Sequence, residues 1–151
     1  ICKLATYEKN NQKFWNFDSY KNLAAVQVAK HDYQPQEEKK FMGAVQTKYV
    51  KKNWSSVMLM NCDKCKSLTP DYVNSATGLQ LHQFKWLEND DLIGDIPLEW
   101  NWLVDEPGYE EKEDVKNLHY TKGGPYFKEY KNCGYSEVWF DHFKETTTID
   151  I

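Results

Sequence analysis

The chain has 151 residues, of which 40% are apolar and 28% are charged, and its net charge at pH 7 is −4. It contains no run of about 18 apolar residues, the length that a membrane-spanning helix needs. All 19 basic residues are lysines, whereas nucleic-acid binders are typically basic and use arginine to bind phosphates and guanine. The composition therefore predicts a soluble single domain over residues 1–151, with no nucleic-acid partner and no membrane span.

The first residues and the cysteines indicate a compartment. Residues 1–15 lack the apolar core of a signal peptide. Cys62 and Cys65 form a CxxC pair, but no second pair completes a zinc site. We predict reduced cysteines in a cytoplasmic protein, with a structural zinc or a redox pair as alternatives. The chain does not begin with methionine, which favours a piece of a longer protein.

The first half of the chain predicts a helix and two strands. The helix is expected within residues 7–22. The segments LAAVQVAK (23–30) and KKNWSSVMLMN (51–61) are typical of buried strands. Their apolar residues run on without alternation, which suits a sheet covered on both faces. The segment between them contains Pro35 and predicts a loop.

The second half predicts more helix, beginning after a capping pattern. Thr69 (or Ser67) before Pro70 marks a helix start, and residues 71–87 predict one or two helices interrupted near Gly78. The remaining expectations are a loop and strand at 93–104, a solvated acidic loop at 105–114, a short strand at 115–121, helix, break and helix over 126–143, and a frayed tail at 146–151. Alternating strands and helices favour an α/β fold.

The segment LHYTKGGPYF (118–127) is the strongest local candidate for a site. His119 could ligate a metal ion, and the backbone of Gly123 and Gly124 could approach an anion such as a diphosphate. Lys122 could reach a phosphate as a point charge. The same residues are also compatible with an ordinary turn that carries a solvated lysine.

Other polar residues have both a functional and a structural interpretation. Asn53, Ser55 and Ser56 could bond sugar hydroxyls or simply cap a strand. Trp100 and Asn101 could form a carbohydrate site or a packed strand end. For His31–Asp32 we favour an ordinary loop pair, and for Asp90–Asp91 a metal role is possible in principle. The nucleophile elbow GxSxG, the P-loop and GxGxxG are all missing from the sequence.

Four segments in order resemble a known family. NWSSVMLMNC, LHQFKWL, IPLEWNWLV and LHYTKGGPYF are similar to the C-terminal half of retaining-type glycosyltransferases of the glycogenin and lipopolysaccharide galactosyltransferase group. The resemblance covers about residues 23–143. It implies a partial GT-A fold, which is a Rossmann-like mixed sheet flanked by helices, and a nucleotide-diphospho-sugar donor with a glycan or another acceptor.

The resemblance also implies roles for particular residues. His119 matches the histidine that holds Mn²⁺ (or Mg²⁺) on the donor diphosphate together with a DxD motif. Gly124 stands where the family has its phosphate-binding lysine, so Lys122 is a possible substitute. Of the family's Asp-Gln-Asp near the reacting sugar, only Gln83 carries over. The remaining matches are donor-contacting or acceptor-side residues: Asn53, Ser55, Ser56, Trp100 and Asn101.

The chain departs from the family at its start. The resemblance places a DxD at about residues 1–8, where this chain has ICKLATYE. We therefore expect either the C-terminal portion of a metal-dependent glycosyltransferase domain that lacks the DxD half, or a degenerate relative that serves as a non-catalytic carbohydrate-binding or interaction module.

Overall fold

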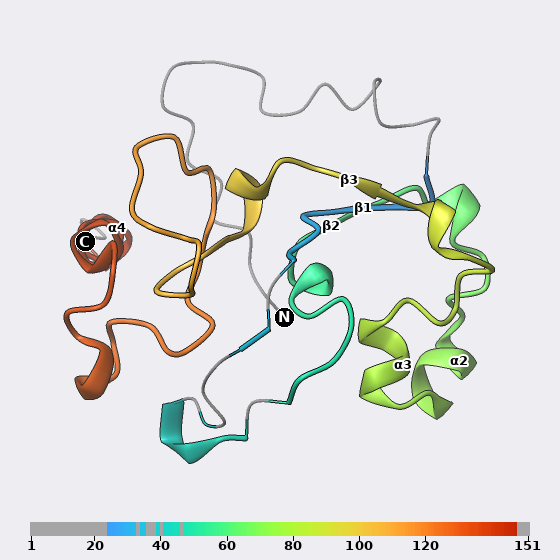
Figure 1. The fold of residues 1–151 in the computed structure, drawn as a ribbon, viewed down its shortest axis with the longest axis horizontal. Coiled ribbons are helices and arrows are strands. Elements are labelled where there is room, and N and C mark those ends of the chain that lie inside the picture. Colours follow the sequence, from blue (N-terminus) through green and yellow to red (C-terminus); the bar gives the residue numbers. More distant parts are fainter. Residues whose placement is uncertain (1–23, 33, 36–38, 40, 46, 148–151) are drawn as a thin grey trace.

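The computed structural model describes residues 24–32, 34–35, 39, 41–45 and 47–147. The helix expected within residues 7–22 and the stretch 1–8 both lie outside these residues. The described part is a mixed α/β structure with a small mixed sheet and few helices. In Figure 1, the sheet lies centrally, with α2 and α3 at one end and α4 at the other.

The three-stranded sheet has the order β2-β1-β3. The central strand β1 (Val26–Val28) is antiparallel to β2 (Met58–Met60) and parallel to β3 (Ile93–Asp95). All three residues of β1 are buried, as the unalternating sequence LAAVQVAK predicts. Both predicted strands are confirmed, but each is shorter than its apolar segment.

The expectation that both strands are covered on both faces is wrong for β2. Its first residue, Met58, is 42% exposed. Strand β2 lies at an edge of this sheet, and none of its three residues is buried. The preceding residues Trp54–Ser56 form a 3-10 helix, which shortens the strand at its start.

The predicted helix interruption near Gly78 is confirmed. Helix α2 (Pro70–Ser75) begins after Thr69, whose side chain accepts a hydrogen bond from the Tyr72 N–H. Helix α3 (Gly78–His82) begins with a capping box between Thr77 and Gln80. Local sequence thus determines both helix starts.

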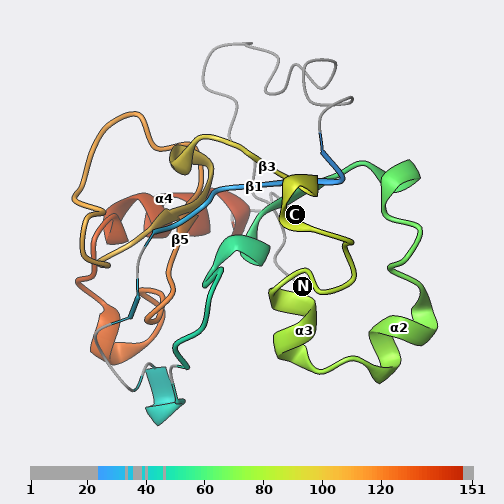
Figure 2. The ribbon, with the colours of Figure 1, turned by 45° about the vertical axis from the view of Figure 1, so that its right-hand side comes forward.

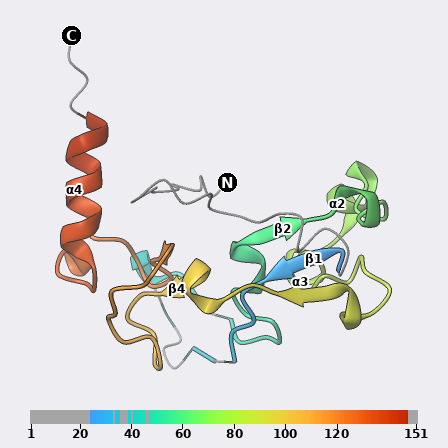
Figure 3. The ribbon, with the colours of Figure 1, turned by 90° about the horizontal axis from the view of Figure 1, so that it is seen from above.

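A separate two-stranded ladder joins β4 (Trp102–Leu103) in parallel to β5 (Leu118–His119). The predicted strand ending at His119 is confirmed. The ladder lies on the side of the molecule that carries α4 (Ser136–Thr147), as Figure 2 and Figure 3 show. The first predicted helix within 126–143 is only a 3-10 turn, at Lys128–Tyr130. Thr146 and Thr147 belong to α4, not to a frayed tail.

The prediction of a wholly solvated acidic loop at 105–114 is wrong in two places. Glu106 and Tyr109 are buried. Tyr109 packs with Trp102 and Leu103 in one cluster of the core, and Glu106 accepts a hydrogen bond from Thr121. A charge run reports the average environment of its residues, so it does not reveal the individual side chains that turn inward.

Two further core clusters flank the sheet. The larger one contains β1 and β3 residues with Phe84 and Trp86 from the segment after α3. The smaller one contains Ala29, Val57 and Ile96, with Trp100 packed against it. Among the residues that the structure describes, no helix has the length and apolar character needed to cross a membrane.

Replacing Leu103, which is fully buried, should lower stability sharply. We expect Leu103→Ala to reduce the free energy of unfolding by about 3 kcal/mol, because it removes buried methyl groups and leaves a cavity. The control Leu79→Ala, at a side chain that is 48% exposed, should cost less than about 1 kcal/mol. Urea denaturation measures both, and equal losses would contradict this placement of the core.

Candidate functional site

The candidate site forms where several segments leave the small sheet at the same end. His31 follows the carboxyl end of β1. Asn53 and Ser56 precede β2, and because Val28 pairs with Met58, they lie at that same end. Strand β3 runs parallel to β1 and leads toward Asn101. In open α/β sheets, the carboxyl ends of parallel strands are the usual place for ligands.

The side-chain amide of Asn101 connects these segments. Asn101 is 0% exposed and ends the 3-10 helix Leu98–Asn101. Its Nδ2 lies 2.9 Å from His31 Nε2, 3.0 Å from the Asn53 carbonyl oxygen and 2.8 Å from Ser56 Oγ. Its Oδ1 lies 3.1 Å from His119 Nδ1. One buried amide therefore joins four residues from three segments that the sequence separates widely.

His31 is held as a neutral imidazole behind this amide. The Asn101 amide nitrogen cannot accept a hydrogen bond, so a proton on the facing His31 Nε2 is disfavoured and the ring proton is on Nδ1. That nitrogen lies 2.6 Å from the Tyr109 hydroxyl oxygen, which accepts the hydrogen bond. Burial, with a smaller effect from the charge of His119, lowers the pKa of His31 to about 4.

On the buried side of the network, beyond His31, lies Tyr109, which is a neutral phenol. Burial, followed by the negative charges of Glu106 and Asp32, raises the pKa of Tyr109 to about 12. Its ring also packs edge-on against Trp102, with ring centroids 5.0 Å apart. The inner side is therefore a fixed hydrogen-bonding frame and not a source of protons near neutral pH.

Segment 51–56 bends around the amide through a left-handed residue. Asn53 has φ 63°, a conformation that asparagine tolerates better than most residues. The Asn53 carbonyl accepts from Asn101 and also from Ser56 Oγ at 2.6 Å. The backbone of Asn53 thus helps to build the network.

On its other side, segment 51–56 contacts the end of α3. Ser55 Oγ lies 2.7 Å from His82 Nδ1. Lys51 Nζ donates to the Gln83 carbonyl at 3.1 Å and pairs with Asp90 at 2.6 Å. Ser55 and Gln83 therefore belong to this outer contact and not to the hydrogen bonds around Asn101. The Asp90 carboxylate is engaged with a lysine.

Trp100 and Lys122 are placed away from the amide. Trp100 packs against the cluster of Ala29, Val57 and Ile96, and its carbonyl accepts from Asn117. For Trp100, this packing agrees with the packed strand end, one of the two interpretations given in the sequence analysis. Lys122 Nζ donates to the Asp105 carbonyl at 2.8 Å, so this lysine braces the loop at 105–114.

The two glycines at 123–124 are buried within a turn. Gly123 has φ 153°. The Gly124 carbonyl accepts from the Phe127 N–H at 3.0 Å, and a Cβ at Gly124 would clash with the Tyr126 ring. The turn therefore favours glycine at position 124 as long as the Tyr126 ring keeps this place.

The described residues do not form a metal site by themselves. Within them, no group of three or more histidine, cysteine, aspartate or glutamate side chains is placed to hold a metal ion. Cys62 is exposed, whereas Cys65 is buried and its thiol donates to the Ala25 carbonyl at 3.2 Å. The four residues His31, Asn53, Ser56 and His119 offer polar atoms around one amide but lack carboxylates, which Mn²⁺ and Mg²⁺ prefer.

Of the predicted site residues, the structure brings together Asn53, Ser56, Asn101 and His119. The sequence analysis missed His31, which it treated as an ordinary loop residue, and it missed Tyr109. His31 is only 5% exposed, while Asp32 beside it is exposed. The position of His31 directly after a predicted buried strand is the sequence feature that could have identified it.

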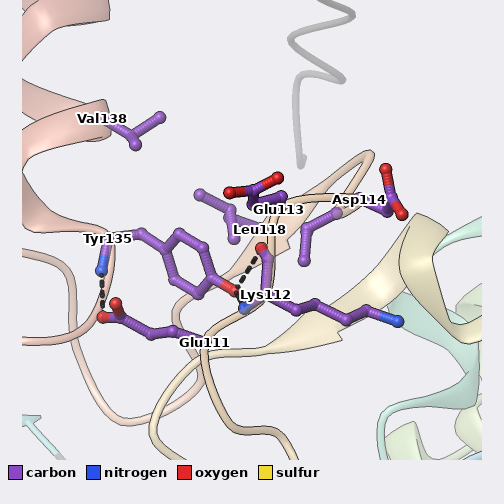
Figure 4. A pocket seen from close by; sticks show the side chains of 8 residues that line it. Glu111, Lys112, Glu113, Asp114, Leu118, Tyr135 and Val138 are labelled. Atoms are coloured by element: carbon purple, nitrogen blue, oxygen red, sulfur yellow. Dashed lines mark hydrogen bonds between the residues drawn. The ribbon is translucent and has the colours of Figure 1, made fainter.

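A cavity of about 740 Å³ lies beside β5 (Figure 4). Leu118, which precedes His119, lines it together with Val115 and Val138. The Tyr135 N–H donates to Glu111 at 3.1 Å, and the Tyr135 hydroxyl oxygen accepts from the Lys112 N–H at 2.7 Å. The lining of the cavity thus combines apolar side chains with acidic ones, including Glu113 and Asp114.

The neutral state of His31 should make stability depend on pH. In the unfolded chain histidine has its ordinary pKa of about 6.5, whereas in the folded chain the pKa is about 4. Between these values the unfolded state binds the extra proton, so the free energy of unfolding should fall by up to about 3 kcal/mol as pH drops from about 6.5 to about 4.

Urea denaturation between pH 4 and pH 8 measures this slope. His31→Gln should flatten it, and His82→Gln, which removes an exposed histidine, is the matched control that should retain it. The same slope in wild type and His31→Gln would contradict a buried neutral His31.

The chain was compared with protein families, curated proteins and solved structures. No family model matches it, and no solved structure matches it. It is 44% identical over 126 residues to Protein CDI of Arabidopsis thaliana, an alignment that covers 80% of this chain and 48% of that protein. The chain therefore spans about half the length of this curated relative.

Proposed function

We propose that the chain is part of a glycosyltransferase that takes its sugar from a nucleotide-diphospho-sugar, and that its small sheet is part of a GT-A fold. One observation carries the proposal: Asn53, Ser56, Asn101 and His119 meet around one buried amide. They come from three of the four segments that resemble the family. A chance resemblance would not require these segments to meet in space.

The chemistry of the network is compatible with a polar, anionic ligand. Ser56 and His119 are both half-buried, so each lies between the core and the surface. A hydroxyl and an imidazole can bond sugar hydroxyls or phosphate oxygens. The rigid amide behind them reduces the entropy that a ligand must overcome to order its contacts.

A divalent cation would stabilise the negative charge that develops on the departing nucleoside diphosphate. His119 is the one candidate ligand for it at this network, and the described side chains form no group of three. The residues present therefore do not fit a Mn²⁺ or Mg²⁺ site by themselves. We therefore assign no step to a metal.

Calorimetry with UDP-glucose and UDP-galactose, each with Mn²⁺ or with EDTA, tests the proposal. We expect binding by the wild-type chain. We expect Ser56→Ala and His119→Ala to weaken it about tenfold each, because each loses a hydrogen bond of about 1.4 kcal/mol to the ligand. The matched controls Ser75→Ala and His142→Ala, on α2 and α4, should bind like wild type. Absence of binding to both nucleotide sugars under both conditions would refute the proposal.

A second candidate function is a carbohydrate-binding module without catalysis. The aromatic residues around α4 favour it: Tyr126 is 62% exposed and lies 5.6 Å from Trp139 between ring centroids, and Trp139 stacks on Phe143. Exposed aromatic faces can pack against the apolar faces of sugar rings. The acceptor of a transferase could use the same surface.

The two functions differ in what they bind and in their need for metal. A binding module should retain neutral glycans in EDTA, and Tyr126→Ala should abolish that binding without changing nucleotide-sugar affinity. Binding on an array of neutral glycans, with Tyr130→Ala as the aromatic control, measures this. Glycan binding that is unchanged in Tyr126→Ala would exclude this surface as the site.

A further inference from the structure

The cavity beside β5 has the size of a small-molecule site. Its volume of about 740 Å³ lies within the range of about 300–1,000 Å³ that is typical of ligand pockets. Its lining comes from two stretches, residues 111–118, which lead into β5, and residues 135–138 at the start of α4. A stable protein interface uses about 20–30 residues on each side, so this lining suits a small ligand better than a protein partner.

The apolar part of the lining is held in place by the core. Val115, Leu118 and Tyr135 pack against the buried cluster that contains Trp102. The Tyr135 hydroxyl group accepts from the Lys112 N–H at 2.7 Å and donates to the Lys112 carbonyl at 3.1 Å. These contacts preform the apolar surface, which an aliphatic ligand would remove from water.

The acidic part of the lining carries charge that the protein leaves available. Glu113 and Asp114 are exposed, and among the described residues no hydrogen bond or ion pair engages their carboxylates. Glu111 accepts from the Tyr135 N–H at 3.1 Å, but a carboxylate has about four lone-pair sites and can accept further hydrogen bonds. Three negative charges therefore face one cavity.

The lysine in the lining does not neutralise this charge. Lys112 Nζ pairs with Glu99 at 2.6 Å and lies 4.3 Å from the centre of the Trp102 ring. In Figure 4, its ammonium group points away from Tyr135. Because Glu99 is not part of the lining, the positive charge of Lys112 is already balanced outside the cavity.

We propose that this cavity binds a small organic cation of the polyamine class, with its ammonium groups on the carboxylates and its methylene segments on Leu118 and Tyr135. In Figure 4, Glu111 and Asp114 lie on opposite sides of the Tyr135 ring, and Glu113 lies above it. A linear molecule with apolar segments between its charges matches this arrangement. An inorganic cation would leave the apolar surface in water, and a neutral molecule would leave the carboxylates unpaired.

The proposed cation site is separate from the hydrogen bonds around Asn101. Leu118 lines the cavity, whereas its neighbour His119 contacts Asn101. Successive side chains of a strand point to opposite faces, so the two places lie on opposite faces of β5. The cation site therefore does not rest on the proposed transferase function.

Calorimetry with spermidine tests the proposal on the wild-type chain, near pH 7.5 and at about 0.15 M salt, which screens loose association of counterions. Mg²⁺ is the control for charge without an aliphatic body, and octanediol is the control for an aliphatic chain without charge. We expect one spermidine to bind per chain, at least about tenfold more tightly than Mg²⁺, and octanediol not to bind. Equal affinity for Mg²⁺, or tighter binding of the tripeptide Lys-Leu-Lys than of spermidine, would overturn the proposal.

A double substitution of exposed carboxylates locates the charge contacts. Glu113→Gln combined with Asp114→Asn should weaken spermidine binding about tenfold, because two ion pairs are lost. Glu88→Gln combined with Asp91→Asn is the matched control, since it removes the same charge from two exposed residues outside the cavity lining. If the two double variants lose the same affinity, spermidine responds only to net charge and the site is refuted.

A pair of valine substitutions locates the cavity independently. Val138 on α4 lines the cavity, whereas Val73 on α2 does not, and both side chains are 43% exposed. Both lysine variants should therefore fold. Val138→Lys places an ammonium group beside the carboxylates and should weaken spermidine binding at least about tenfold, while Val73→Lys should bind like wild type. Wild-type affinity in Val138→Lys would show that spermidine does not occupy this cavity.

Discussion

The buried amide of Asn101 is the interaction on which the candidate site depends. A fully buried amide must satisfy its hydrogen bonds within the protein, because an unmade one costs about 1–3 kcal/mol. Here the cost is avoided by partners from three segments: His31 after β1, Asn53 and Ser56 before β2, and His119 at the end of β5. The amide therefore holds together segments that the strand pairing brings near one another.

The two histidines beside Asn101 have different roles because their surroundings differ. His31 is buried, burial lowers its pKa to about 4, and its two ring nitrogens contact Tyr109 and Asn101. His119 is half-buried at a strand end. Burial makes His31 a structural support, whereas the position of His119 nearer the surface makes it the candidate for contact with a ligand. This difference is consistent with the proposed donor site.

Local features of the fold were predictable from short stretches of sequence. The cap at Thr69, the break near Gly78, the buried strand at Val26–Val28 and the strand ending at His119 each depend on neighbours within a few residues. The exposed start of β2 and the buried Tyr109 were not predictable. They depend on which elements happen to cover them, which no local pattern contains.

The sequence by itself determined the residue types of the candidate site, including His119, Asn101 and Ser56, and the α/β character of the chain. Only the tertiary structure decided which of them meet. Asn101 contacts His31 across 70 residues and Ser56 across 45. Lys122 instead donates a hydrogen bond to the Asp105 carbonyl. The physical reason is that strand pairing and burial, not sequence spacing, bring distant polar groups within hydrogen-bonding distance.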